Sequence, residues 1–281
     1  MSRLQRCTHE QETCSRHQRI VCHHIHTNCE TLIDTSCHPY TVEEASEAYL
    51  KAADCYRIAG QSFEQTNATI SAGAVLKKVN PKRAAELLLQ GTKALVADGH
   101  FASAAKHQQD AGEMFEAEGD TENAVACLRT AAEYYEMENS TSRANTCMLK
   151  VAQLVADTGK YDEAIEIYEK VARAALDNNL LKFSVRGYLF NAFLCQLAKQ
   201  DTVGASRALE RYKELDATFA NQRECKLCDA VLEACDNLDV DAFTRAVADF
   251  DSLTPLDAFR THLLLQAKRM IENAGDSSQL V

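Results

Sequence analysis

The sequence predicts an all-α fold built from stacked antiparallel helix hairpins, and three observations support this. Only 3 prolines and 10 glycines occur in 281 residues, whereas average composition is about 5% proline and about 7% glycine. Glycine or asparagine recurs at a nearly constant interval over much of the chain. Between these positions the apolar residues follow the period of an α-helix.

The recurring positions are expected to end helices, because glycine and asparagine adopt the left-handed backbone conformation most easily. Successive members are almost evenly spaced, and each interval accommodates one helix and one turn. The members are Gly60, Asn80, Gly99, Gly119, Asn139, Gly159 and Asn179.

Small residues recur in step with these turns. An alanine follows five residues after most of them, and a second small or β-branched residue follows seven residues later, on the same helical face. Small side chains there let neighbouring helices approach closely. Two such helices form a hairpin of about 40 residues, longer than the 34 of a standard tetratricopeptide repeat but of the same design. The positions are Ala85, Ala104, Ala124, Ala144 and Ala164, and then Ala111, Ala131, Val151 and Val171.

The spacing becomes less regular after Asn179, but amphipathic helices continue. They are expected over 180–200, 204–217, 220–236, 239–252 and 256–273, with Asp239 and Asp241 at one helix start and Pro255 at another. We therefore predict a tetratricopeptide-like α-solenoid over 41–200 and a C-terminal helical bundle over 201–274. Residues 1–40 form a Cys/His-rich leader expected to be disordered, and residues 275–281 a flexible tail.

Composition and motifs argue against several functions. The formal charge of -11 disfavours nucleic-acid binding, which needs clustered lysine and arginine. No apolar run approaches the length needed to cross a bilayer, and we expect a cytoplasmic protein. Phosphate-binding glycine loops, HExxH and GxSxG strings are all missing, so neither an enzyme nor a bound cofactor is expected.

The cysteines give two weaker signals. Five cysteines and six histidines lie between Cys7 and His38, and both residue types bind Zn²⁺. Their spacing does not match structural zinc sites, so a zinc-dependent protein is only a minor alternative. Cys225, Cys228 and Cys235 have a helix-face spacing and no βαβ pattern beside them, which favours small buried side chains over redox chemistry.

Basic residues recur at equivalent places in the repeat. Lys106, Thr146 and Arg186 are evenly spaced along the chain, and each stands seven residues after a turn position. Lys77, Lys78, Lys150 and Lys182 lie on helices that could contribute to the same side. Such residues are often ordinary solvated lysines, but a basic stripe in an acidic protein also attracts an elongated acidic partner.

Four strings resemble the soluble NSF attachment proteins, of the alpha type. They include AAKHQQDAGEMFEAEGDTENAVACLRTAAEYY at 104–135 and SRANTCMLKVAQLVADTGKYDEAIEIYEKVA at 142–172, and two more lie at 180–195 and 223–268. The similarity runs in register from about Asn67 to Val281, and a weaker match begins near Thr41.

This resemblance implies an adaptor that binds SNARE complexes and recruits the AAA ATPase N-ethylmaleimide-sensitive factor, which then separates the SNARE helices. It also implies peripheral association with membranes. The runner-up is a peptide-binding tetratricopeptide scaffold of the chaperone-adaptor kind.

The resemblance assigns residues to each partner. The positions aligned with the SNARE-binding face are Lys77, Lys78, Lys106, Lys150, Lys182 and Arg186. The positions aligned with the ATPase-binding end are Asp201, Glu233, Asp236, Asp276 and Leu280, the last being a penultimate leucine needed to stimulate ATP hydrolysis. The chain departs from the family at Thr146, where lysine is usual, and residues 1–40 lack the phenylalanines that touch the bilayer.

Overall fold

The computed structural model describes residues 39–178 and 181–278, and all regular structure in these residues is helical. The predicted all-α class is confirmed. The helices are α2 (Pro39–Ile58), α3 (Ser62–Leu76), α4 (Pro81–Ala97), α5 (Phe101–Ala117), α6 (Thr121–Met137), α7 (Thr141–Asp157), α8 (Tyr161–Leu176), α9 (Lys182–Ala198), α10 (Thr202–Leu215), a 3₁₀ turn (Phe219–Asn221), α11 (Arg223–Asp236), α12 (Val240–Leu253) and α13 (Ala258–Ser278).

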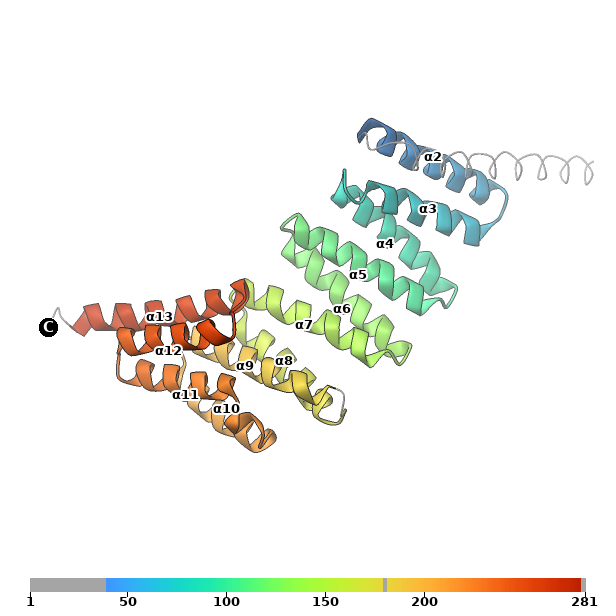
Figure 1. The fold of residues 1–281 in the computed structure, drawn as a ribbon. Helices are drawn as coiled ribbons and strands as arrows, with labels where there is room; N and C mark the ends of the chain where they lie inside the picture. The colour runs from blue at the N-terminus through green and yellow to red at the C-terminus, as the bar shows by residue number, and fades with distance from the viewer. Residues whose placement is uncertain (1–38, 179–180, 279–281) are drawn as a thin grey trace, which may run out of the picture. The chain divides into compact units, whose positions relative to one another are not determined.

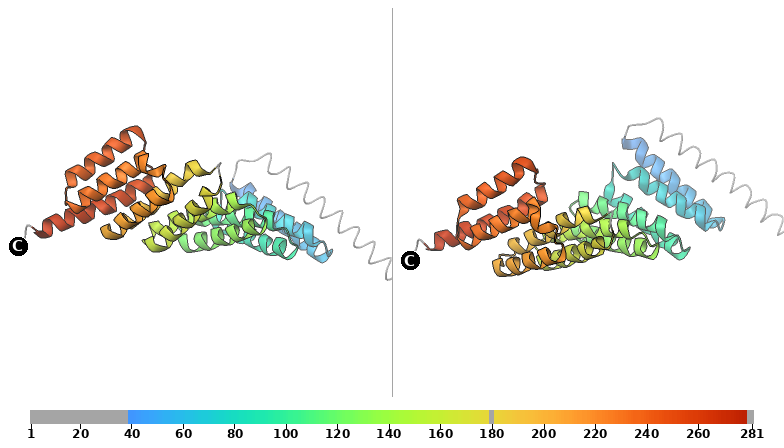
Figure 2. Two further views of the ribbon diagram at one scale, coloured as in Figure 1. Left: turned by 90° about the horizontal axis from the view of Figure 1, so that it is seen from below. Right: turned by 60° about the horizontal axis from the view of Figure 1, so that its bottom comes forward.

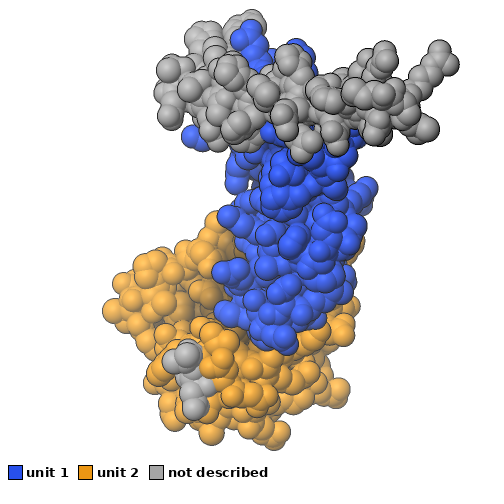
Figure 3. Space-filling model, turned by 90° about the vertical axis from the view of Figure 1, so that its right-hand side faces the viewer, with its two compact units in different colours: residues 1–147 blue, residues 148–281 orange. Residues whose placement is uncertain are grey.

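The chain divides into two compact units, Met1–Cys147 and Met148–Val281, with the boundary inside α7. The two units are coloured separately in Figure 3. In unit 1 each of the helices α2, α3, α4 and α5 packs against the next one along the chain, as the sequential hairpins of the repeat require. Figure 1 shows these helices following one another in antiparallel order.

Unit 2 has a different centre. Helix α9 contacts α8, α10, α11 and α13, and the further views in Figure 2 show α11, α12 and α13 gathered together. Helix α9 can occupy this position because it is apolar on most of its surface, with Leu189, Phe190, Phe193 and Leu194 fully buried. The C-terminal helices therefore form a bundle and not a further run of repeats.

The turn positions were predicted correctly with one exception. Glycine or asparagine adopts the left-handed conformation at 60, 99, 119, 139 and 159. The N–H that follows each of them donates to the carbonyl five residues back, for example His100 to Leu95 at 2.8 Å and Asp120 to Phe115 at 2.9 Å, which is the Schellman closure of a helix. Asn179 lies outside the described residues.

Asn80 is the exception. Its φ is -144°, and its side chain accepts a hydrogen bond from the backbone N–H of Arg83, so that it caps the start of α4. Asparagine serves this role as readily as it serves a left-handed turn, because its side-chain oxygen can satisfy a free N–H of the first helical turn. The predicted interval is therefore correct at this position, but the predicted local conformation is wrong.

The small residues of the repeat are all buried, as expected at helix contacts. The recurring alanines and valines are all at most 3% exposed. In the α3–α4 pair, a side chain in place of Gly91 would collide with Ile70. Close packing of α3 against α4 thus depends on a small residue at position 91, which the repeat did not single out.

The starts of α12 and α13 also agree with the prediction from the sequence. Asp239 caps α12 through the N–H of Ala242 at 2.8 Å, and Asp257 accepts from the N–H of Arg260 at the start of α13. Pro255 precedes that helix. Helix α13 continues to Ser278, past the position 274 at which the bundle was expected to end. The predicted domain boundaries at positions 40, 200 and 274 stay a prediction. The Cys/His-rich leader lies outside the described residues.

No helix in the described part of the chain is both long and apolar enough to cross a membrane.

Candidate functional site

In unit 1, two of the predicted basic residues, Lys77 and Lys106, lie near one carboxylate. Lys77 follows the last residue of α3, and its Nζ lies 3.5 Å from Oδ1 of Asp110 on α5. Lys106 precedes Asp110 by four residues and is exposed on the same helix, so the two side chains are neighbours on its surface. We call Lys77, Lys78 and Lys106 the unit 1 basic cluster.

His107 adds no charge to this cluster at neutral pH. Burial of its ring lowers the pKa below its usual value, and the nearby Lys106 lowers it further, while Asp110 raises the pKa and partly offsets these effects. The positive charge therefore belongs to the lysines. Lys78 is exposed at the end of α3.

Thr146 stands where the repeat would place a further base. Its exposed hydroxyl donates to the carbonyl of Ser142, one turn earlier in α7, at 3.0 Å. The side chain is therefore satisfied within its own helix and supplies no charge.

In unit 2, Lys182 and Arg186 lie one turn apart at the start of α9, and both are exposed. Lys182 is the first residue of α9, where a cation is disfavoured because the helix dipole is positive there, so helix formation does not explain its presence. Arg186 is held from the start of α11: its Nη1 donates to Gln222 at 3.3 Å, and its Nε lies 3.6 Å from Glu224.

The same two residues line a hollow of about 480 Å³, together with Leu176, Phe183, Asp216, Thr218 and Gln222. Phe183 is 83% exposed beside it. Lys150 is half-buried on α7. The structure thus brings together Lys77 with Lys106 in one unit and Lys182 with Arg186 in the other. That all six basic residues share one face stays a prediction, since they belong to two units.

The acidic candidates fall into two kinds. Asp201 has a structural role, because its carboxylate caps α10 through the N–H of Gly204 at 2.7 Å. Glu233 and Asp236 are exposed in the last turn of α11. We call these two residues the acidic end of α11. Asp276 lies in α13, and Leu280 lies outside the described residues.

The cysteine prediction is confirmed where it can be compared with the structure. Cys225, Cys228 and Cys235 are buried and carry free thiols. Burial raises the pKa of Cys225 and Cys235 to about 11 and that of Cys228 well above its usual range. A thiol held protonated is a poor nucleophile. Among the described residues no group of three potential metal ligands occurs, and the Cys/His-rich leader lies outside them.

Comparison with known proteins assigns the family. The family described as "Soluble NSF attachment protein, SNAP" matches residues 40–272. The chain belongs to this family.

Several relatives agree with this assignment. An alpha-soluble NSF attachment protein of Dictyostelium discoideum is 41% identical over 180 residues, covering 64% of this chain and 62% of that protein. One of Vitis vinifera is 39% identical over 250 residues, covering 82% and 86%. A probable vesicular-fusion protein sec17 homolog of Schizosaccharomyces pombe is 34% identical over 255 residues, covering 83% and 88%.

For a soluble NSF attachment protein, the structure adds residues that the sequence did not reveal. Asp110 and Glu224 hold Lys77 and Arg186, and exposed Phe183 lines the same hollow as Lys182 and Arg186. Carboxylates are common on helix surfaces, and an aromatic residue at the start of a helix usually belongs to the core. Only the side-chain contacts distinguish these three from the many similar residues along the chain.

Proposed function

We propose that this chain is an adaptor that attaches the AAA ATPase N-ethylmaleimide-sensitive factor to SNARE complexes, so that the ATPase can separate the SNARE helices after membrane fusion. The observation that carries this proposal is the family match over residues 40–272. The similarity to a relative named as a vesicular-fusion protein supports it.

The SNARE complex would be bound by Lys77, Lys78, Lys106, Lys150, Lys182 and Arg186. A bundle of acidic helices needs basic groups that are not already neutralised. Among the described residues, Lys106 and Lys182 have no carboxylate within 4.0 Å, and both are exposed. Complementary charge of this kind raises the association rate and sets the orientation of the partners.

The ATPase would be bound through the C-terminal end, by Asp201, Glu233, Asp236, Asp276 and Leu280. The acidic end of α11 supplies exposed carboxylates for a basic surface. The chain supplies binding and orientation, while ATP hydrolysis and the associated work belong to the ATPase. Catalytic groups in the adaptor are not needed for this role.

The same proposal includes a place in the cell. The adaptor would be cytoplasmic and peripherally associated with membranes, where SNARE complexes remain after fusion. In this arrangement residues 41–200 would form the SNARE-binding solenoid, and the bundle over 201–274 would face the ATPase.

A bridging experiment tests this function. SNARE complexes are immobilised, the purified chain is added, and capture of the ATPase is measured with and without the chain. We expect capture only when the chain is present. Capture that does not depend on the chain, or no binding of the chain to SNARE complexes, would refute the adaptor role.

The variant Leu280→Ala tests whether recruitment of the ATPase and stimulation of its ATP hydrolysis depend on different residues. We expect this variant to capture the ATPase nearly as well as the original chain but to stimulate ATP hydrolysis less. Val281→Ala is the matched control, because it removes a neighbouring aliphatic side chain at the same end. Equal stimulation by both variants would show that Leu280 has no special role.

A further inference from the structure

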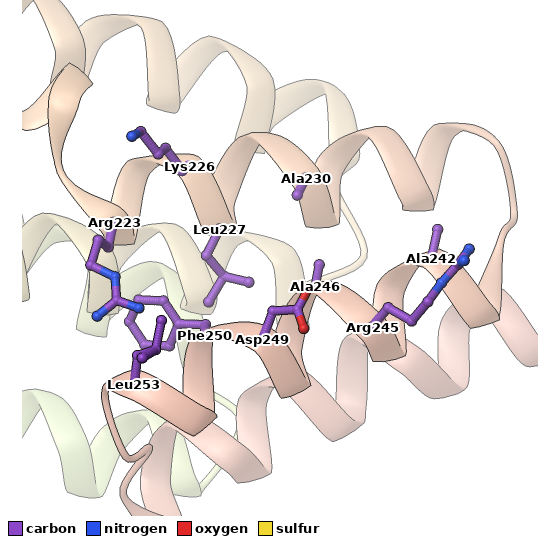
Figure 4. Close-up of a pocket in the computed structure, with 10 residues that line it drawn as sticks. All are labelled: Arg223, Lys226, Leu227, Ala230, Ala242, Arg245, Ala246, Asp249, Phe250 and Leu253. Carbon is purple, nitrogen blue, oxygen red and sulfur yellow. The ribbon is translucent and has the colours of Figure 1, made fainter.

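A second candidate binding surface lies wholly within unit 2. Helices α11 and α12 border a groove of about 570 Å³ that none of the residues proposed above lines. Figure 4 shows that its lining comes from both helices, with Leu227 and Phe250 between them.

The floor of the groove is apolar and has small side chains along its length. Ala230, Ala242 and Ala246 line it, and Leu253 at its end is 71% exposed. Alanines let another backbone come close, and a large exposed aliphatic residue is a suitable anchor for an apolar partner. The groove thus has the shape and chemistry that receive one face of a helix.

The rim has the opposite charge to its surroundings. The segment 201–278 contains 15 acidic and 9 basic side chains. Nevertheless the groove is lined by Arg223, Lys226 and Arg245, which are all the basic residues of α11 and α12, and by one carboxylate, Asp249.

These three cations are not neutralised within the described residues, since none has a carboxylate within 4.0 Å. The contrast with basic residues nearby is clear. Lys213 lies 3.1 Å from Glu210 and 2.9 Å from Asp229. The three basic side chains of the groove therefore have no carboxylate partner, although the segment around them is rich in acidic residues.

Two of the cations are nevertheless held in place. Arg223 donates to the hydroxyl of Thr254 at 3.1 Å and lies over the ring of Phe250, 6.0 Å from its centroid. The Nε of Arg245 donates to the carbonyl of Asp241 at 3.3 Å. These contacts orient the guanidinium groups and leave their charge available to a ligand.

We propose that the groove between α11 and α12 binds an acidic amphipathic helix of a partner polypeptide. The apolar face of that helix lies on Leu227, Ala230, Ala246 and Phe250, and its carboxylates meet Lys226 and Arg245. A helix fits this surface because the apolar lining follows α11 and α12 and is bordered by cations from both helices.

A synthetic peptide provides the probe. It is about five helical turns long, with leucine at helical i, i+3, i+4 and i+7 positions and glutamate on both flanks, and it carries a fluorescein label. Its binding to the full chain is measured by fluorescence anisotropy at low and high salt. One control peptide has the same composition in scrambled order, and a second replaces glutamate with lysine.

The matched variants are Arg245→Glu and Lys226→Glu in the groove and Arg269→Glu on α13, which is exposed and does not line the groove. Each changes the charge equally. We expect each groove variant to weaken peptide binding at least tenfold, Leu253→Ser to weaken it about threefold, and Arg269→Glu to change it less than twofold. Both control peptides should bind at least tenfold more weakly.

Three results would overturn the proposal. They are no binding of the acidic peptide, equal weakening by Arg245→Glu and Arg269→Glu, and equal binding of the scrambled peptide. Vesicles of phosphatidylserine that bind the chain and lose binding in Arg245→Glu, while the peptide does not bind, would assign the groove to membranes. Because the probe contains neither SNAREs nor the ATPase, its result is independent of the proposed adaptor function.

Discussion

The unit 1 basic cluster and the acidic end of α11 carry opposite charges and stand in opposite relations to their helices. Lys77 is stabilised where it is, because it lies at the C-terminal end of α3 and pairs with Asp110. Glu233 and Asp236 lie at the C-terminal end of α11, where the helix dipole disfavours carboxylates, and no basic side chain lies within 4.0 Å of them among the described residues.

The local structure of α3 accounts for the charge of Lys77, whereas the local structure of α11 does not account for the charges of Glu233 and Asp236. Lys77 contributes to its local structure, so its presence says little about a partner. The acidic end of α11 costs some helix stability, and residues retained in spite of such a cost are better candidates for binding. The predictions below change each region and ask whether binding and stability respond separately.

The largest effect is expected from reversing both carboxylates, as Glu233→Lys with Asp236→Lys. Association with the ATPase should weaken by at least about thirtyfold, since four charge units change in one contact region. SNARE binding should remain within twofold. Glu166→Lys on α8, which is also exposed, is the single-site control.

The same double variant should be more stable, because lysines at a helix C-terminus interact favourably with its dipole, by roughly 0.3–1 kcal/mol each. Chemical denaturation measures this. A variant that lost stability together with ATPase binding would contradict the distinction drawn between the two regions.

Lys106→Glu should weaken binding to SNARE complexes about tenfold, which corresponds to about 1.4 kcal/mol. It should lower stability by no more than about 0.5 kcal/mol, because Lys106 is exposed and only the new i,i+4 repulsion with Asp110 opposes the change. Lys93→Glu on α4, exposed in the same unit, is the control with the same charge change. Similar losses for both variants, in a binding titration at fixed salt, would indicate only a general effect of charge.

Asp110→Asn should have the smallest effect and the opposite sign. It removes the partner of Lys77 while keeping the shape of the side chain, so SNARE binding should become about two- to threefold tighter. Surface ion pairs contribute at most about 1 kcal/mol, which limits the gain. Glu122→Gln on α6 removes one negative charge from an exposed position of the same unit and should change affinity less.

Much of the fold could be predicted because helix ends in the repeat depend on residues with a strong local preference. Gly99, Gly119 and Gly159 adopt left-handed conformations that glycine accepts without strain. The recurring alanines mark the helix contacts directly. A left-handed turn favours glycine and a close helix contact favours alanine, so both features can be recognised from the residue type in the sequence.

The turns after α9 and α11 could not be predicted in this way. Gln200 and Leu238 adopt the same left-handed conformation, with φ of 67° and 53°, although neither residue favours it. After α11 the N–H of Asp239 still donates to the carbonyl of Ala234 at 2.9 Å, so the same helix closure forms at a residue that does not signal it. The site shows the same limit, because the partners of Lys77 and Arg186 come from other helices, and no spacing rule within one helix identifies them.

The most direct test of the account is the rate of ATP-dependent disassembly of purified SNARE complexes by N-ethylmaleimide-sensitive factor as the chain is titrated. We predict no disassembly without the chain, a rate that rises and saturates as it is added, and about tenfold more chain needed for the same rate with Lys106→Glu. Disassembly that does not depend on the chain, or a chain that binds both partners and leaves the rate at zero, would contradict the account.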